Sequence, residues 1–377
     1  MPQILIVAGE ASGDLHGANL ARALRELDPA VRLVGVGGAA MKSAGVQLVE
    51  GFGHLDVMGI VGFSALRAII RRFVAMRRLL RSERWDAVVF IDNPGLNLRY
   101  AWFAKSAGLR VIYYIAPQIW AWRPGRMKYI QQRVDQVMVI LPFEPELYRK
   151  VGLPCTFVGH PLLDAVAPHY NQAKLREQFG LKPSGRVIAL LPGSRSAEVR
   201  LHLPILLEAA ERLMRDDPAT QFLMAQASTI ADDLIQPLLQ KSAAPVTVVA
   251  EQASEVMAAA DLIFVASGTA TLQAAVVGTP MVLLYQAHSW LTYRLARLLI
   301  RVKWIGLVNL VAGRTVVTEL IQHEATGARV YHEARRLLDD RAAYDEMKRS
   351  LQAVKASLGQ PGASRRAAQV VLDACRA

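Results

Sequence analysis

Two strand–glycine–helix junctions in the second half of the chain carry the residue types that bind phosphate. Each begins with a short apolar run, Val187–Leu191 or Leu262–Val265, continues with a glycine beside small hydroxyl residues, and leads into a helical pattern. Such a junction directs backbone N–H groups and the positive end of a helix dipole at one spot. Two junctions, one of them with an arginine, predict a diphosphate site formed by Gly193, Ser194, Arg195, Ser267, Gly268 and Thr269.

A candidate general base, Asp92, follows the apolar run Ala87–Ile91 and precedes an Asn-Pro-Gly turn. Ligands of α/β sheets bind at the carboxyl ends of the strands, so this carboxylate could face a substrate. It could then take a proton from an attacking hydroxyl group. The alternative is that Asp92 only caps the turn, and its position alone leaves both interpretations open.

Two further segments of the first half could contact a sugar or a phosphate. The loop GEASGD follows the first apolar run, although its serine and aspartate could instead cap the next helix. In IWAWRPGR, two tryptophans beside arginines indicate a platform for a sugar ring or acyl chain with a phosphate clamp, whereas the alternative is a packed core. The candidate contacts are Glu10, Ser12, Asp14, Trp120, Trp122 and Arg123.

Several cofactor and metal chemistries lack their sequence signals. The first glycine-rich loop is not GxGxxG, no acidic residue ends the run Val31–Val36, and there is no Walker A motif. No His, Asp or Glu cluster has metal-ligand spacing, and there is no Asp-x-Asp. The only two cysteines, Cys155 and Cys375, argue against a disulfide framework and fit a reducing cytosol. We therefore expect neither a cofactor nor a catalytic metal.

Short apolar runs alternate with helical patterns along the whole chain, which predicts an α/β fold with parallel sheets covered by helices on both faces. The length of 377 residues indicates two domains. We predict two Rossmann-like domains, residues 1–165 and 166–345, whose sheets face an interdomain cleft. The last helices, about Tyr331–Leu358 and Ala363–Cys375, are expected to place residues 346–377 back on the first domain.

The formal net charge is +12, and the positive charge is concentrated in two acid-free stretches. Residues 57–82 contain six arginines and no acidic residue, and residues 262–318 also lack acids. Such segments favour anionic partners: phosphates, nucleic acid or an anionic lipid surface. The alternative is a basic, soluble surface that binds none of them. Residues 63–82 form an amphipathic helical pattern with arginines on its polar face, and residues 290–304 are similar; both could lie on a membrane surface, or the first could simply pack on a core.

No segment is predicted to cross a membrane. The N-terminus has no basic region before a long apolar stretch, so it is interpreted as a strand rather than a signal peptide. The uncharged stretch Leu262–Tyr293 is broken by glycine and proline. We expect a cytoplasmic protein, peripheral on the inner membrane, and leave its oligomeric state open between a monomer and a homodimer.

Nearly the whole chain resembles the lipid-A-disaccharide synthase family. The resemblance lies in ordered blocks: VAGEASGDLHGA, VMGIVG, FIDNPGLN, IWAWRPGR, LPFEPELY, FVGHPLLD, LLPGSRSAEV, ASGTATLQAA and NLVAGRTVVTEL. It implies a GT-B glycosyltransferase that joins UDP-2,3-diacylglucosamine to 2,3-diacylglucosamine 1-phosphate. The product would be a β-1,6 disaccharide with UDP released, by inversion, and no nucleic acid would be involved.

The resemblance also implies roles for individual residues. Residues 1–165 would bind the acceptor, with Asp92 as the base, and residues 166–345 would bind the UDP-sugar. The donor contacts would be Arg195, Ser267, Gly268, Thr269, Gln273, Asn309 and Arg314. Two departures affect donor binding: Gly95 replaces a second acid, and Gln273 replaces a glutamate expected to bind the ribose. Glutamine hydrogen-bonds hydroxyls more weakly than an ionised carboxylate.

Two other functions fit parts of the pattern. The first is another GT-B enzyme acting on UDP-GlcNAc, a 2-epimerase or a peptidoglycan-precursor transferase. The basic amphipathic segment and the IWAWR block argue against a soluble epimerase. The second is a non-catalytic nucleotide-binding protein at the membrane surface, motivated by Gly95 and Gln273.

Overall fold

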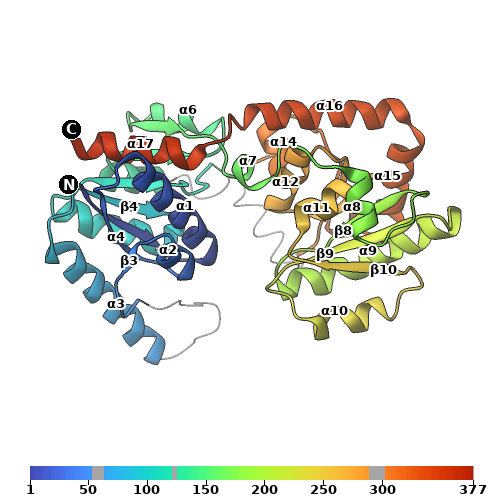
Figure 1. Cartoon of the computed structure of the whole chain (residues 1–377), viewed down its shortest axis with the longest axis horizontal. Coiled ribbons are helices and arrows are strands. Elements are labelled where there is room, and N and C mark those ends of the chain that lie inside the picture. The colour runs from blue at the N-terminus through green and yellow to red at the C-terminus, as the bar shows by residue number, and fades with distance from the viewer. Residues whose placement is uncertain (53–62, 121–124, 288–301, 377) are drawn as a thin grey trace. The chain divides into compact units, whose positions relative to one another are not determined.

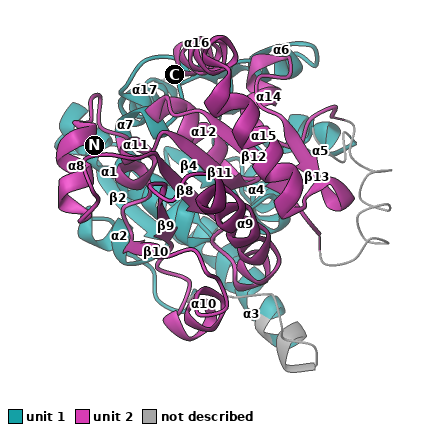
Figure 2. Ribbon diagram, turned by 90° about the vertical axis from the view of Figure 1, so that its right-hand side faces the viewer, with its two compact units in different colours: residues 1–164, 358–377 teal, residues 165–357 magenta. Residues whose placement is uncertain are grey.

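The computed structural model describes residues 1–52, 63–120, 125–287 and 302–376 of the chain (Figure 1). It divides into two compact units, coloured separately in Figure 2. Unit 1 comprises Met1–Asp164 and Leu358–Ala377, and unit 2 comprises Ala165–Ser357. The chain therefore crosses between the units twice, first inside the proline-containing segment of residues 159–171 and again just before the last helix.

Unit 1 is built on a seven-stranded parallel sheet in the order β3-β2-β1-β4-β5-β6-β7. Its strands are β1 (Gln3–Ala8), β2 (Arg32–Val36), β3 (Gln47–Leu48), β4 (Ala87–Ile91), β5 (Val111–Tyr114), β6 (Gln136–Val139) and β7 (Cys155–Phe157). Its helices are α1 (Ala11–Leu27), α2 (Ala39–Ser43), α3 (Phe63–Ser82), α4 (Pro94–Ser106), α5 (Arg126–Arg133), α6 (Glu144–Arg149) and α17 (Ala363–Arg376). The two-residue β3 is too short to be recognised from periodicity.

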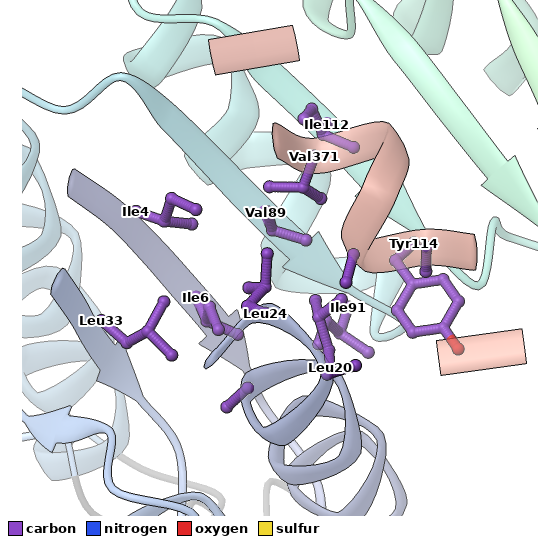
Figure 3. Close-up of a cluster of buried hydrophobic side chains, with 14 of the residues drawn as sticks. Ile4, Ile6, Leu20, Leu24, Leu33, Val89, Ile91, Ile112, Tyr114 and Val371 are labelled. Carbon is purple, nitrogen blue, oxygen red and sulfur yellow. The ribbon is translucent and has the colours of Figure 1, made fainter. Parts of the chain in front are cut away.

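Apart from Gln3 at the start of β1, the central strands β1, β4 and β5 of unit 1 consist of buried hydrophobic residues, because helices cover both faces of the sheet. On one face, Ile4 and Ile6 of β1 pack with Leu20 and Leu24 of α1 and with Val371 of α17 (Figure 3). On the other face, the alternate residues of β1 and β4 pack against α3, α4 and α5. This burial fixes the strand register and thereby the positions of the loops at the strand ends.

Unit 2 repeats the design with a six-stranded parallel sheet in the order β10-β9-β8-β11-β12-β13. The strands are β8 (Val187–Leu191), β9 (Gln221–Gln226), β10 (Val246–Ala250), β11 (Leu262–Ala266), β12 (Met281–Tyr285) and β13 (Glu319–Ile321). The helices are α8 (Gln172–Gln178), α9 (Ser196–Asp216), α10 (Asp232–Leu239), α11 (Ala253–Ala259), α12 (Thr269–Val277), α14 (Leu307–Ala312), η1 (Gln322–Glu324), α15 (Gly327–Asp339) and α16 (Arg341–Ser357). The short helix α7 (Leu162–Ala165) lies at the first crossing, and all but its last residue belong to unit 1. The short β13, which begins with a glutamate, is absent from the sequence-based strands.

The C-terminal helices differ from the sequence-based expectation. The predicted helix over residues 331–358 is two helices, α15 and α16, because the carboxylate of Asp340 accepts the N–H groups of Ala342 and Ala343 and starts a new helix. The helix α16 packs on α12 and α14 and belongs to unit 2, so residues 346–357 do not return to unit 1.

Only the last helix, α17, returns to unit 1, where it lies along α1 (Figure 1). The carboxylate of Asp164 accepts the N–H groups of Gly362 and Ala363 at the start of this helix. Arg366 donates to the carbonyl oxygen of Val158 at 2.8 Å. These bonds tie the two crossing segments together within unit 1.

Both sheets have the strand order in which the connections reverse direction between two neighbouring central strands. In such sheets, ligands bind at the carboxyl ends of those two strands. In unit 1 they are β1 and β4, where Ala8 pairs with Ile91, so the loops at Gly9 and Asp92 emerge side by side. In unit 2 they are β8 and β11, where Leu191 pairs with Val265. The sheet topology therefore brings together the residues with candidate chemistry.

Candidate active site

The carboxyl edge of the sheet in unit 2 holds a cavity of about 660 Å³. Gly193 and Ser267 each lie two residues beyond the paired positions Leu191 and Val265, and both line this cavity. The predicted donor-site residues in its lining are Gly193, Ser194, Arg195, Ser267, Gly268, Thr269 and Gln273. The structure thus gathers into one cavity the two junctions that the sequence places far apart.

The first junction joins β8 to α9 and wraps around a carboxylate. Gly193 has a φ of +123°, a conformation that favours glycine. A Cβ at Gly193 would lie 2.6 Å from Oε2 of Glu198, so a side chain there would collide with this carboxylate. The N–H groups of Ser194 and Arg195 donate to Oε2 of Glu198 at 3.2 and 3.3 Å. Glu198, which the sequence analysis missed, is therefore a component of the cavity.

The second junction joins β11 to α12 and leaves room for a ligand. A Cβ added to Gly268 would meet no atom within 4 Å, so the space beside it is open. The hydroxyl of Ser267 donates to the carbonyl oxygen of Ile305 at 3.3 Å. The amide nitrogen of Gln273 donates to Oγ of Ser254 at 2.7 Å, which fixes the position of the Gln273 side chain at the cavity wall.

Asn309 and Arg314 do not line the cavity, contrary to the expectation from the resemblance. Asn309 is fully buried and donates to Val317 and Glu319. Its side-chain oxygen accepts the N–H groups of Val316 and Val317. Arg314 donates to Ser350 of α16. The amide of Asn309 is thus fully hydrogen-bonded within the turn that it stabilises, which favours a supporting role over direct contact with the donor.

Glu319 links this turn to the second junction. Its carboxylate accepts the N–H groups of Ile305 and Gly306 at 2.9 and 3.0 Å, and the carbonyl oxygen of Ile305 accepts from Ser267. Asn309 and Glu319 therefore support the cavity through Ser267 rather than lining it. Only their place in the NLVAGRTVVTEL block could have indicated this, because hydrogen-bond partners cannot be read from the sequence.

His202 of α9 is a second buried support that the sequence analysis did not single out. Its Nδ1 lies 3.1 Å from the carbonyl oxygen of Pro192, and its Nε2 accepts the N–H of Gln286 at 3.1 Å. Because Nε2 accepts a hydrogen bond, Nδ1 carries the ring proton and donates to Pro192, and burial lowers the pKa of the imidazole. It connects the first junction to the end of β12.

In unit 1, Asp92 and Glu10 lie near each other at the carboxyl ends of β4 and β1. Asp92 has a φ of +48°, a left-handed conformation that aspartate tolerates better than most residues. Its carbonyl oxygen accepts from Tyr113 at 2.6 Å and from Asn97 at 2.8 Å, which holds the backbone in this conformation. Burial first, and the charge of Glu10 in addition, raise the pKa of the Asp92 carboxyl.

The loop before α1 separates into exposed and buried residues. Glu10 and Ser12 are exposed. Asp14 is buried, and its carboxylate accepts the N–H groups of Gly38, Ala40 and Met41 at 2.7, 3.0 and 3.1 Å. The carboxylate of Asp14 therefore holds the start of α2 within unit 1, and these contacts favour a structural role for Asp14 over a contact with the acceptor.

Trp120 is also held by an internal partner. Its Nε1 donates at 3.0 Å to Glu144, whose other oxygen accepts the N–H of Leu141, and its ring packs edge-on against Phe143. Burial raises the pKa of Glu144 to about 7. These contacts favour a packing role for Trp120 over that of an exposed platform. Trp122 and Arg123 lie outside the described residues.

No group of three His, Cys, Asp or Glu side chains among the described residues is placed to hold a metal ion. The two cysteines are both free thiols. The positive groups beside the cavity are instead Arg195 and the N-terminal ends of α9 and α12.

Solved structures with the same fold include sugar-nucleotide enzymes. The S. aureus MnaA–UDP co-structure aligns with a TM-score of 0.65 and 13% identity, covering 97% of this chain and 94% of that one. The Neisseria meningitidis UDP-GlcNAc 2-epimerase aligns with a TM-score of 0.63 and 12% identity, covering 98% of this chain and 100% of that one. Acinetobacter baumannii MurG aligns with a TM-score of 0.60 and 15% identity, covering 99% of this chain and 100% of that one. The likeness, with the two parallel sheets, confirms the predicted α/β GT-B fold.

Sequence comparison narrows the class to one family. The model of the family described as lipid-A-disaccharide synthetase matches residues 4–374. Lipid-A-disaccharide synthase from Geobacter sulfurreducens is 43% identical over 98% of this chain and 97% of that protein. The enzyme from Nitrosococcus oceani is 41% identical over 98% of this chain and 96% of that protein. This chain belongs to the lipid-A-disaccharide synthetase family and is a glycosyltransferase.

Proposed function

We propose that this enzyme transfers diacylglucosamine from UDP-2,3-diacylglucosamine to 2,3-diacylglucosamine 1-phosphate, forming a β-1,6-linked disaccharide 1-phosphate and UDP. Its family membership supports the synthesis of the lipid A disaccharide. The single observation that supports the donor site is the convergence of two phosphate-binding junctions in the cavity of unit 2. Within this proposal, Gln273 contacts the nucleotide, and Glu10 and Ser12 contact the acceptor.

The proposed chemistry is one in-line displacement. Asp92 takes the proton from the 6-hydroxyl group of the acceptor while the oxygen of that hydroxyl group forms a bond to C1 of the donor. The bond between C1 and the phosphate oxygen breaks at the same time, and the electron pair leaves with UDP. One displacement converts an α-linked donor into a β product. Arg195 and the N-termini of α9 and α12 stabilise the charge that develops on the diphosphate.

The raised pKa of Asp92 predicts a specific pH dependence. A general base must be ionised, so kcat/KM should fall as pH falls through the pKa of Asp92. Replacing Glu10 by glutamine removes a negative charge near Asp92, which should lower this pKa and move the acid limb of the profile to lower pH. Glu26→Gln, an exposed change at the other end of α1, should leave the limb unchanged. An unmoved limb in Glu10→Gln would contradict the proposed coupling.

The direct test of the proposed reaction uses synthetic diacylated donor and acceptor. Mass spectrometry should detect the disaccharide 1-phosphate only when both are present, and the anomeric coupling in the NMR spectrum should report a β linkage. The same enzyme given UDP-GlcNAc alone should leave it unchanged. Conversion of UDP-GlcNAc to its 2-epimer would instead favour an activity like that of the Neisseria meningitidis relative.

We further propose that unit 1 contacts an anionic membrane surface through α3 and its neighbours. No helix among the described residues is long and apolar enough to cross a bilayer. Part of the apolar face of α3 packs on the core, since Met76 and Leu80 are buried and Phe73 lies 5.3 Å from the ring of Tyr100. The exposed arginines of this helix are Arg67, Arg71, Arg77, Arg78 and Arg81.

Large apolar side chains are nevertheless exposed on three consecutive helices of this face, which pack on one another. They are Ile70 and Val74 of α3, Trp102 of α4 and Tyr129 of α5. Apolar side chains among arginines are typical of interfacial attachment to anionic lipid. Most of the second predicted membrane segment, residues 290–301, lies outside the described residues.

Vesicle co-sedimentation tests this surface. The enzyme should bind phosphatidylglycerol vesicles more tightly than phosphatidylcholine vesicles, and added salt should weaken the binding. The double variant Ile70→Ser/Trp102→Ser should reduce binding about tenfold, because two partly exposed side chains lose their burial in lipid. Trp102→Phe, which keeps an aromatic ring, should bind nearly as the wild type. Equal binding to neutral and anionic vesicles would contradict the proposal.

A further inference from the structure

The phosphate-binding groups of the first junction are already engaged by an anion, the side chain of Glu198. Oε2 of Glu198 accepts the two backbone N–H groups of Ser194 and Arg195, and Oε1 accepts from the guanidinium of Arg195 at 2.7 Å. Gly193 passes so close to the carboxylate that no side chain would fit between them. One carboxylate therefore uses the backbone donors at the N-terminus of α9 together with the arginine beside them.

In this arrangement the carboxylate of Glu198 occupies the position that a phosphate group of a ligand would take. A carboxylate and a phosphate use the same donors: backbone N–H groups at a helix N-terminus and a guanidinium group. Glu198 lines the cavity together with Ser267, Gly268 and Thr269 of the second junction. A diphosphate held by both junctions therefore competes with Glu198 for Arg195 and the N–H groups.

The ion pair between Arg195 and Glu198 lies near the protein surface, where a diphosphate can displace the carboxylate. The side chain of Arg195 is 72% exposed and that of Glu198 is 27% exposed, so neither is locked in the core. Exposed ion pairs are worth at most about 1 kcal/mol, so a ligand with more negative charge can displace this one. On the other side of the loop, Thr229 donates to the carbonyl oxygen of Ser194 at 2.6 Å and keeps the backbone in place during the exchange.

We propose that Glu198 is an internal substitute for the diphosphate: it holds Arg195 and the backbone donors in position in the empty enzyme, yields them to the donor substrate, and reclaims them when UDP leaves. The inference rests on the proposed diphosphate site in unit 2. A helix-capping glutamate with no other role would stabilise α9 without affecting diphosphate affinity. A competing glutamate weakens the affinity for UDP and accelerates its release.

Titration calorimetry with UDP and with uridine separates these two roles. Glu198→Gln keeps the size and one hydrogen-bond acceptor of the side chain but removes its charge. It should bind UDP about fivefold more tightly than the wild type, since a like charge is removed from a partly exposed site, and uridine with unchanged affinity. The matched control is Glu208→Gln, which removes an exposed charge from the same helix, outside the cavity, and should leave both affinities unchanged.

The outcomes are distinct. Unchanged or weaker binding of UDP by Glu198→Gln would overturn the inference while leaving the diphosphate site intact. Tighter binding of both UDP and uridine would overturn it as well, because the effect would not depend on the phosphates. Failure of the wild type to bind UDP, or identical affinity in Arg195→Ala, would remove the proposed donor site itself. Slower release of UDP from Glu198→Gln in stopped-flow measurements is the kinetic counterpart of the expected result.

Discussion

Replacing Asp92 by asparagine should lower kcat by at least ~10²-fold, because an amide cannot accept the proton of the attacking hydroxyl group. Asparagine is the sharper test than alanine, since it tolerates the left-handed backbone at Asp92 (φ +48°) and keeps the size of the side chain. The affinity for UDP should not change, because the proposed contacts of UDP lie in unit 2. Turnover of synthetic donor and acceptor, with UDP calorimetry alongside, provides both readouts.

The alanine variant at Asp92 should show the same loss of turnover, with some loss of stability from backbone strain. Similar thermal unfolding of the wild type and the asparagine variant would show that the loss is chemical. Near-normal turnover in either variant would remove Asp92 from the mechanism. Retained UDP binding with no product from the wild type would favour the non-catalytic nucleotide-binding alternative.

Replacing Arg195 by alanine should weaken UDP binding about 10- to 100-fold, because hydrogen bonds to charged groups contribute about 1.5–3 kcal/mol each. Uridine, which lacks the diphosphate, should bind with unchanged affinity. The UDP affinity of Arg195→Lys should fall between those of the wild type and Arg195→Ala, because lysine keeps the charge but not the planar pair of donors. Calorimetry with both ligands is the measurement.

Arg200→Ala is the matched control for Arg195. Arg200 is exposed on the same helix α9 but does not line the cavity, so its removal changes the net charge equally without removing a contact. UDP affinity should therefore stay at the wild-type value in this control. An equal loss in both variants would mean that Arg195 acts only through the overall charge of the protein.

The sequence predicted most of the fold because the central strands of both sheets are buried on both faces. The apolar runs of β4, β8 and β11 are buried at every position, and such runs are visible without a structure. The short β3 and β13 and the break at Asp340 were missed because two or three residues carry no periodic signal and a capping bond is a tertiary detail. The GT-B class was implied by the family resemblance and is confirmed by the comparisons.

The site residues that follow the carboxyl ends of strands could be predicted from the sequence. The roles of buried polar residues that hydrogen-bond to the backbone could not. Both junctions and Asp92 stand at the carboxyl ends of central strands, so position alone indicated them. Asp14 and Asn309 have the same residue types as ligand-binding groups, but their side-chain oxygens accept backbone N–H groups of their own unit. Glu198 was overlooked for the opposite reason: three residues into a helix, it resembles an ordinary cap.

Diffraction from crystals of this enzyme soaked with UDP would locate the diphosphate itself. We expect it between Gly193–Arg195 and Ser267–Thr269, with the Arg195 guanidinium turned from Glu198 to a phosphate oxygen and Gln273 beside the nucleoside. UDP bound at any other place, or in this cavity with its phosphates away from both junctions, would contradict it.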